Sequence, residues 1–374
     1  MDRELRSLVA FDELIDALVD ARDGYVLSEA RGHDETEVLE GLRYVLQVLS
    51  EVDELIVEGD PERPRFSSIV SPARKFLGDN PDALYQQALI RGDRSYRIRG
   101  RRREQDYISF TVHGPAPDGG MAGAVQNDVN DRDLDVAPDG TFELVLAAAG
   151  SGVEGVPLQP DAHIVLVRNY YQQALSAHVD PSIAVELSIE PIEDPGPAPL
   201  VDDEALAGRL TAATRFLRAA TEGLRVFGEP AKVPFASNEP NDVGPPWSFR
   251  SAEIDQPGAV DIYYSSGSFD LEPGQAMVMD AVVPAGPFTN VMLWNVHMQT
   301  LDYTSRRSSL NASQMVGEAD GRCRIVISAE DPGVPNWLDT GGHRRGTIFW
   351  RFLLPESEPA RPVCSVVPVS EVRS

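Results

Sequence analysis

The sequence predicts a mainly β protein with α-helical additions, an α+β chain built from two antiparallel domains of the β-sandwich or jelly-roll-like kind. Short runs rich in β-branched and aromatic residues recur from about residue 66 onward, separated by Gly, Pro, Asp and Asn clusters. Helical spacing of apolar residues appears only near the N-terminus and after residue 199. With 374 residues, the chain is long enough for two ordinary cores plus helices.

The predicted elements fall into four segments, which are N-terminal helices (1–65), a first β domain (66–198), a connecting helix (199–228) and a C-terminal β-sandwich domain (229–374). The second N-terminal helix opens at Asp34 with Glu37 three positions later, as in a capping box. Strand runs in the C-terminal segment follow one another without helical patterns between them, which favours a sandwich over a parallel α/β sheet.

The last long strand is expected to be central in its sheet. The run "TIFWRFLL" is apolar on both faces, with Ile348, Trp350 and Phe352 on one side and Phe349 and Leu353 on the other. Such a pattern is typical of a strand that is buried between two layers. The preceding "DPGVPNWLDTGG" supplies a turn and a glycine-rich entry.

Charge and cysteine content narrow the class of protein. The formal net charge is -26, from 59 acidic and 33 basic residues, so nucleic acid and anionic membrane surfaces are not expected partners. No window is apolar enough for a membrane span, and the first twenty residues lack the pattern of a signal peptide. Two cysteines are too few for a disulfide framework. We expect a cytoplasmic protein with a small-molecule ligand. Whether it forms a homo-oligomer is left open by the sequence.

Two C-terminal runs resemble the bacterial domain-of-unknown-function family 1214. They are "YYSSGSFDLEPGQAMVMDAVVPAGPFTNVMLWN" and "DPGVPNWLDTGGHRRGTIFWRF", within a module of about residues 251–355. The earlier "GDNPDALYQQALIRGD" is similar to the β segment that precedes this module in longer members, so the resemblance covers roughly residues 75–355. It implies a mainly antiparallel β protein with a C-terminal sandwich and no transferable catalytic residues. The association of some actinobacterial relatives with steroid or other lipid catabolism implies an apolar ligand.

Familiar catalytic and cofactor motifs are missing from the sequence. It has no Gly-x-Ser-x-Gly elbow, no Gly-x-x-x-x-Gly-Lys phosphate loop and no Gly-x-Gly-x-x-Gly after a strand. No histidine lies within two to five residues of another, so no close pair could start a metal site. We expect no cofactor and no metal, although dispersed histidines could still converge in space. The six are His33, His113, His163, His178, His297 and His343.

The strongest candidate for a site is "NVMLWNVHMQTLDYTSRR", residues 290–307. If this run continues as a strand, Asn295, His297 and Gln299 share one polar face. The loop that follows adds Asp302, Tyr303, Arg306 and Arg307. The alternative is that one face of an antiparallel strand is commonly wet, and a histidine on it needs no functional explanation.

Further candidates for ligand binding are Tyr263, Trp337 and His343. The adjacent Tyr263 and Tyr264 point to opposite faces of a strand, so one could line a pocket while the other packs in the core. Trp337 and His343 are expected on the loop before the last strand, and loops on rigid sheets are where sites tend to be built.

Two classes of function remain open. The first is an enzyme that acts on a small apolar or carboxylated molecule near the C-terminal β domain, at the domain junction. In it His297 is the general acid/base, Asp302 orients His297, and Arg306 or Arg307 holds an anionic group. The ligand contacts expected in this class also include Asn295, Gln299, Tyr263, Tyr303, Trp337 and His343. The second class is a non-catalytic protein for ligand binding or assembly.

Overall fold

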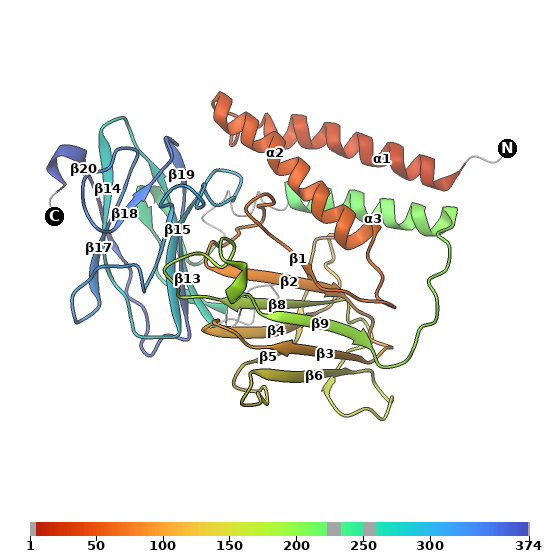
Figure 1. Ribbon diagram of the computed structural model, residues 1–374. Coiled ribbons are helices and arrows are strands. Elements are labelled where there is room, and N and C mark those ends of the chain that lie inside the picture. Colours follow the sequence, from red (N-terminus) through yellow and green to blue (C-terminus); the bar gives the residue numbers. More distant parts are fainter. Residues whose placement is uncertain (1–4, 223–232, 250–258, 260, 373–374) are drawn as a thin grey trace.

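The computed structural model describes residues 5–222, 233–249, 259 and 261–372. Two β domains lie side by side, and three helices cover one end of the first domain (Figure 1). This arrangement confirms the predicted mainly β class with α additions. No helix among the described residues is long and apolar enough to cross a membrane.

The first β domain packs two sheets face to face. Its strands are β1 (Ser67–Ser68), β2 (Ala83–Leu89), β3 (Tyr96–Arg101), β4 (Tyr107–His113), β5 (Val125–Asn130), β6 (Thr141–Ala147), β7 (Val156–Pro157), β8 (Ile164–Tyr170) and β9 (Glu186–Pro191). One sheet has the order β1-β2-β8-β4-β5 and the other β7-β6-β3-β9. Side chains such as Ile98, Phe110 and Val165 fill the space between them. The other face of β8 is apolar as well, and it lies under the helices.

The second β domain is also a two-sheet sandwich. Its strands are β10 (Ala236–Pro240), β11 (Asp242–Val243), β12 (Trp247–Ser248), β13 (Ile262–Asp270), β14 (Gln275–Val282), β15 (Phe288–Trp294), β16 (Ser309–Asn311), β17 (Arg322–Ser328), β18 (Trp337–Asp339), β19 (Arg345–Leu353) and β20 (Val363–Pro368). The larger sheet has the order β10-β13-β19-β15-β16, with β11 and β12 also paired to β13. The smaller sheet has the order β18-β17-β14-β20.

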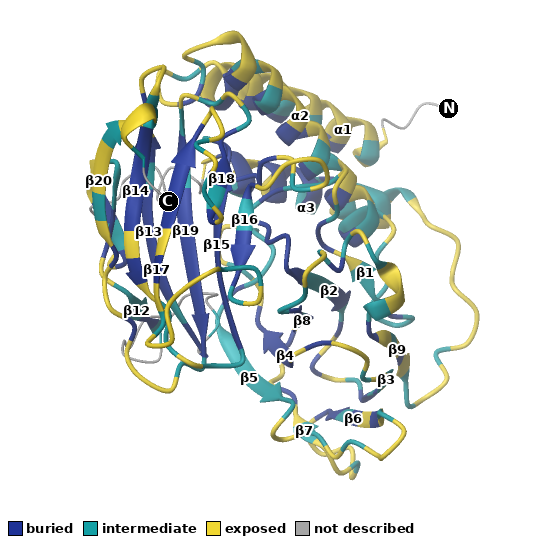
Figure 2. Cartoon of the chain, turned by 60° about the vertical axis from the view of Figure 1, so that its left-hand side comes forward, coloured by how far each residue is buried: buried dark blue, intermediate teal, exposed yellow. Residues whose placement is uncertain are grey.

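The strand β19 lies between β13 and β15 and is buried on both faces, as predicted (Figure 2). Ile348, Trp350 and Phe352 point into the core of the second sandwich. Phe349 and Leu353 point the opposite way, into a core that the second domain shares with the first domain and the helices. The larger sheet therefore separates two apolar interiors.

The helical layer consists of α1 (Arg6–Asp20), α2 (Glu35–Val52) and α3 (Asp203–Glu222). The expected cap is present, because a carboxylate oxygen of Asp34 accepts a hydrogen bond from the Glu37 backbone N–H at 2.9 Å. The helix α1 lies mainly along α3: the Asp203 side chain accepts hydrogen bonds from the backbone N–H groups of Arg6 and Ser7, each at 3.0 Å. The expected end of the connecting helix, near residue 228, lies outside the described residues.

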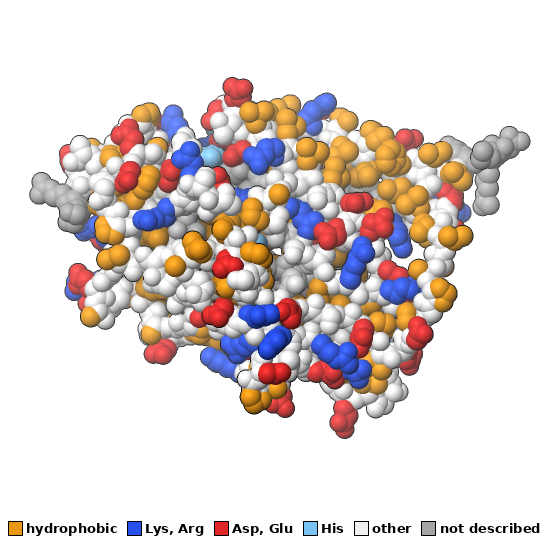
Figure 3. Space-filling view, in the orientation of Figure 1, with side chains coloured by type: hydrophobic (Ala, Val, Ile, Leu, Met, Phe, Trp, Pro, Cys, Tyr) orange, Lys and Arg blue, Asp and Glu red, His pale blue; other side chains and the backbone are white. Residues whose placement is uncertain are grey.

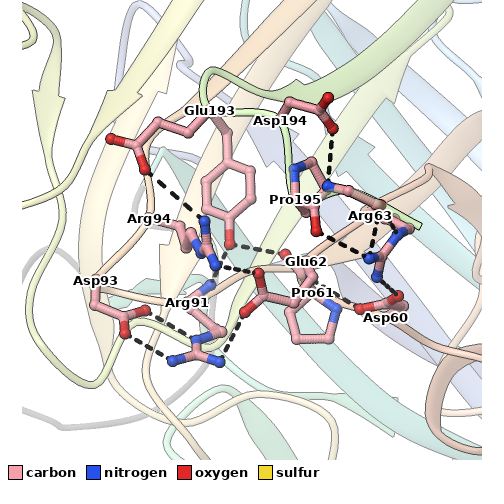
Figure 4. A network of polar contacts seen from close by, with 12 residues as sticks. Asp60, Pro61, Glu62, Arg63, Arg91, Asp93, Arg94, Glu193, Asp194 and Pro195 are labelled. Carbon is pink, nitrogen blue, oxygen red and sulfur yellow. Dashed lines mark hydrogen bonds and ion pairs between the residues drawn. The ribbon is translucent and has the colours of Figure 1, made fainter. Parts of the chain in front are cut away.

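A polar network holds the chain segments that flank the helices against the first β domain (Figure 4). Glu62, which follows α2, forms ion pairs with Arg91 at 2.8 Å and with Arg94 at 2.6 Å. Arg63 donates hydrogen bonds to the backbone carbonyls of Pro195 and Gly196, in the segment that leads to α3. These contacts tie the segment after α2 to the loop after β2 and to the segment that leads to α3.

The segment Gly78 to Asp82, with the sequence GDNPD, joins the two domains and is called the GDNPD clasp below. The Nδ2 group of Asn290 on β15 donates hydrogen bonds to Asn80 Oδ1 at 2.7 Å and to Asp82 Oδ2 at 3.0 Å. Asn311 Nδ2 donates to Asp82 Oδ1 at 3.0 Å. All four side chains are buried, so amide donors of the second domain meet acceptors of the first, while Asn80 Nδ2 and Asn290 Oδ1 have no hydrogen-bond partner among the described residues.

The first two residues of the GDNPD clasp contact the end of β15. Trp294 Nε1 donates a hydrogen bond to the carbonyl of Asp79 at 2.9 Å, and the Thr300 backbone N–H donates to Asp79 Oδ1 at 2.8 Å. Gly78 has a φ of 78°, and a Cβ there would lie 2.8 Å from the Trp294 ring. Glycine is therefore required at this position by both backbone conformation and close approach.

We expect Asn290→Ala to lower the free energy of unfolding by about 3 kcal/mol, because it removes two buried hydrogen bonds and leaves their acceptors without these donors. Urea unfolding followed by tryptophan fluorescence measures the change. Asn238→Ala is the matched control, since Asn238 is exposed and its effect should stay within about 0.5 kcal/mol. Equal effects of the two substitutions would contradict a stabilising role for the clasp.

Candidate functional site

A cavity of about 530 Å³ lies between the two β domains and beneath α3. Its walls come from β8, from the domain-facing sides of β13, β15 and β19, from α3, and from the segments 69–79 and 118–122. Most lining side chains are aliphatic or aromatic. The volume falls within the range of roughly 300–1,000 Å³ that is typical of small-molecule sites. We call this space the interdomain cavity.

Two arginines line the interdomain cavity, one from each domain. Arg168 lies on β8 between Leu166 and Tyr170, on the strand face turned away from the first sandwich core. Arg351 occupies the corresponding position on β19, between Phe349 and Leu353. The alternation of side chains along each strand turns both guanidinium groups toward the shared interior.

Arg351 is only 6% exposed and forms no ion pair with any described residue. One Nη atom donates to the carbonyl of Gly78 at 3.0 Å, and the other lies 3.1 Å from the Met292 sulfur. The guanidinium carbon is 4.7 Å from the ring centroid of Phe349 and 5.4 Å from that of Trp294. These partners are all neutral, although aromatic faces attract cations. A full positive charge therefore borders an apolar cavity.

Arg168 is half-buried and donates a hydrogen bond to the Thr111 hydroxyl at 2.7 Å. Among the described residues it too forms no ion pair. Burial raises the pKa of the nearby Asp128, and the charge of Arg168 acts against that rise. Tyr170, two residues along β8, is fully buried and lines the cavity. Burial raises the pKa of its hydroxyl well above the usual value, so this phenol stays protonated and can donate a hydrogen bond.

Two carboxyl groups of the GDNPD clasp lie near Arg351 without pairing with it. Asp79 lines the cavity, and its oxygens accept hydrogen bonds from the backbone N–H and the hydroxyl of Thr300. Burial raises the pKa of Asp79, and burial raises the pKa of Asp82 to about 6. Both acids are thus shifted toward the neutral form and are already occupied by other donors.

His297 lies outside the cavity wall and is completely buried against the helices. Its Nε2 donates to the carbonyl of Glu37 at 2.8 Å, and its Nδ1 lies 3.2 Å from the Tyr25 hydroxyl. The ring packs against both Tyr25 and Tyr44, with centroids 5.4 and 6.2 Å away. These contacts give His297 a structural role, which fastens the second domain to α2.

The strand predicted to carry His297 ends earlier than expected. β15 stops at Trp294, and residues 295–298 form a turn in which Met298 has a φ of 56°. Asn295 Oδ1 accepts hydrogen bonds from the backbone N–H groups of His297 and Gln299, and so stabilises the turn. The prediction that Asn295, His297 and Gln299 share one strand face is therefore wrong. Gln299 instead donates to Lys75 O at 2.7 Å.

Asp302 and Arg306 do not meet His297. The Asp302 carboxylate accepts hydrogen bonds from Thr304 and Ser305 within its own turn, which lower its pKa to about 2. Arg306 forms an ion pair with Asp339 at 2.8 Å. None of the three lines the interdomain cavity. Their assignment as an acid/base, an orienting carboxylate and an anion-binding group stays a prediction, and the geometry does not favour it.

The remaining candidate residues are distributed over the second domain. Arg307 donates to the carbonyl of Pro335, and Trp337 Nε1 donates to that of Ser328. Trp337 begins the short strand β18, so its expected placement on a loop is wrong. His343 lies 2.9 Å from a Glu40 carboxylate oxygen, and this contact raises its pKa against the effect of burial. It joins the second domain to α2.

The three candidate tyrosines occupy different environments. Tyr263, the expected ligand contact, packs against the core of the second sandwich and does not line the cavity. Its neighbour Tyr264 lines the cavity instead. The Tyr303 hydroxyl is buried without a hydrogen-bond partner in the described part of the chain, and Lys75 Nζ lies 4.4 Å from its ring centroid. Burial raises the pKa of Tyr303.

Sequence reasoning did not select Arg351 as a candidate, although a signal was present. "TIFWRFLL" and "HIVLVRNYY" each place one arginine within a strand that is otherwise strongly apolar. On a strand with two buried faces, a charge has no solvent to point to. An arginine on such a strand therefore indicates that its side chain faces a cavity or a buried partner. No group of three or more potential ligands for a metal ion is found among the described His, Cys, Asp and Glu side chains.

The substitution His297→Ala should lower the free energy of unfolding by about 3 kcal/mol, since it removes a buried ring and its hydrogen bonds. Burial also lowers the pKa of His297 below 6.5, so the folded state resists protonation and the wild-type protein loses stability as the pH falls through this value. That part of the acid sensitivity should vanish in the variant.

Urea unfolding at a series of pH values tests both effects, with exposed His33→Ala as the control. A His297→Ala protein as stable as the control would show that the buried contacts contribute little, and would return His297 to consideration as a functional group.

Comparison with known proteins gives a close structural relative but no activity. A crystal structure of an uncharacterized protein from Burkholderia cenocepacia has a TM-score of 0.86 and 28% sequence identity, over 97% of this chain and 98% of that chain. The VPA0106 protein from Vibrio parahaemolyticus has a TM-score of 0.49 and 14% identity, over 87% of this chain and 97% of that one. No curated protein matches the sequence significantly. Residues 275–357 match the family described as "Protein of unknown function (DUF1214)", so the C-terminal domain carries the module that the sequence resemblance indicated.

Proposed function

We propose that this protein binds a small, predominantly apolar molecule in the interdomain cavity. The observation that carries the proposal is the cavity itself, about 530 Å³ bounded by aromatic and aliphatic side chains from both domains and α3. A ligand that covers apolar surface in the cavity removes that surface from water, which favours binding by roughly 25 cal/mol per Å². An apolar site of this size can bury much of the surface of a small lipid or a polycyclic molecule.

Binding is favoured over catalysis by the chemistry of the lining residues. No histidine, cysteine, serine or lysine is among the described residues that line the cavity. Its one buried carboxyl group, Asp79, is occupied by Thr300. A general acid or base has to reach the reacting atom, and His297 lies in another part of the structure. The enzyme alternative would therefore need a reaction served by tyrosine or aspartate.

We expect Ala219→Phe to weaken binding of a neutral apolar probe by at least about tenfold, because Ala219 on α3 lines the cavity and a phenyl group would fill part of it. Fluorescence titration with N-phenyl-1-naphthylamine, which carries no charge, measures the affinity. Ala205→Phe on the exposed side of α3 is the control and should bind like the wild type. Saturable binding that is unchanged in Ala219→Phe would place the probe elsewhere, and its absence in the wild type would refute the proposed function.

A second candidate function is assembly of this chain with a second copy through α1. This helix exposes Leu8, Phe11, Ile15 and Val19 in one stripe at helical spacing, each between 43% and 58% exposed. Its opposite side already packs against α3 through Ala10 and Ala17. A helix that is apolar on both sides is normally covered on both sides. Figure 3 shows hydrophobic side chains gathered over the helical layer.

The substitution pair Phe11→Glu and Ile15→Glu should convert an assembled form to a monomer, because it places two charges in the centre of the exposed stripe. Sedimentation velocity measures the mass. The control introduces the same charges at Leu175 and Val316, which are 63% and 61% exposed on other surfaces. A wild-type protein that sediments as a monomer at all concentrations tested would exclude self-association through α1.

A further inference from the structure

We infer that the ligand of the interdomain cavity carries a carboxylate group, and that Arg351 binds it. The inference rests on the proposed function, which it deepens by naming the class of ligand. An apolar ligand alone would explain the walls of the cavity. It would leave unexplained why a buried strand at its centre carries a cation.

The first argument is the cost of the arginine as it stands. A buried charge without a counterion is strongly destabilising, typically by several kcal/mol relative to a paired one. Arg351 has a carbonyl, a thioether sulfur and two aromatic faces around it, which reduce this cost without supplying a negative charge. A leucine or methionine at this position would suit the surrounding apolar side chains. The guanidinium is therefore expected to serve an anion that arrives from the cavity.

The second argument concerns the negative groups that could already neutralise Arg351. Asp79 and Asp82 are the acids whose pKa its charge acts to lower, and neither forms an ion pair with it. The oxygens of Asp79 accept from Thr300, and those of Asp82 accept from Asn290 and Asn311. Burial raises the pKa of both acids, but Asp82, with a pKa of about 6, is ionised at pH 8, where its oxygens are held by the two asparagine amides and not by Arg351. No described carboxylate therefore pairs with the Arg351 guanidinium, which remains available to a carboxylate in the cavity.

The third argument selects a carboxylate among anions. Cavity-lining cations in the described chain are limited to Arg351 and Arg168, and no lysine joins them. A phosphate dianion would normally require more donors than one buried and one half-buried arginine. A carboxylate fits a single guanidinium in bidentate geometry, and a protonated phenol such as Tyr170 can donate to it as well. The apolar walls would then hold the hydrocarbon part of the same molecule.

The test compares two ligands that differ only in the charged group. Dodecanoate and methyl dodecanoate compete with N-phenyl-1-naphthylamine for the wild-type protein at about pH 8, where the acid is ionised. We expect dodecanoate to displace the probe at a concentration at least about tenfold lower than the ester does, since hydrogen bonds to charged groups contribute about 1.5–3 kcal/mol. Equal displacement by the two ligands would overturn the inference while leaving the proposed function intact.

The variant Arg351→Met should bind the neutral probe and the ester, and should lose the preference for dodecanoate. Arg324→Met, at an exposed arginine on β17, is the matched control and should keep that preference. If Arg351→Met fails to fold, the ligand comparison in the wild-type protein still decides the question. A protein that binds neither the probe nor either ligand would refute the proposed function itself. A preference that survives in folded Arg351→Met would show that another group binds the carboxylate.

Discussion

The structure depends on the GDNPD clasp, where buried acceptors of the first domain meet buried donors of the second. Asp82 accepts from two asparagines of the second domain, and the backbone of Asp79 accepts from the Trp294 ring. Each bond is modest in net free energy, but a buried donor or acceptor without its partner costs more than the bond contributes. Sliding one domain against the other would break several such bonds together. The clasp therefore fixes the relative position of the domains more strictly than apolar packing alone would.

The same interaction shapes the interdomain cavity. Gly78 is the first residue of the clasp. Its carbonyl accepts the hydrogen bond from Arg351, and its Cα lies against Trp294. The residues that join the domains are thus in direct contact with those that line the cavity. A change in the clasp is expected to alter the cavity as well as the stability, because no flexible spacer separates them. Interiors that are closely packed transmit such shifts with little loss.

The fold was largely predictable because its signals are local. Alternating apolar residues predict the strands, turn residues separate them, and the doubly apolar "TIFWRFLL" correctly predicts a central strand. The packing of α1 along α3 was not predictable, since it pairs segments almost 200 residues apart through an Asp203 side chain. The placement of His297 on a strand face was wrong for a different, local reason. The strand β15 ends before His297, because Asn295 stabilises a turn in which Met298 has a positive φ. Glycine usually occupies such a position, and since none is present the sequence did not predict the turn.

The contrast between His297 and Arg351 shows which kind of polar residue marks a site. His297 is buried, yet both ring nitrogens have protein partners, so its polarity is used within the fold. Arg351 is also buried, but a carbonyl and a thioether meet its hydrogen-bonding needs only in part and leave its charge unbalanced. Residue type alone cannot separate these cases, because histidine is the commoner catalytic group. The position in the fold distinguishes the two residues. A lone charged side chain on a strand that is buried on both faces cannot reach solvent, so it needs a partner inside the protein. For Arg351, that partner would bind in the interdomain cavity.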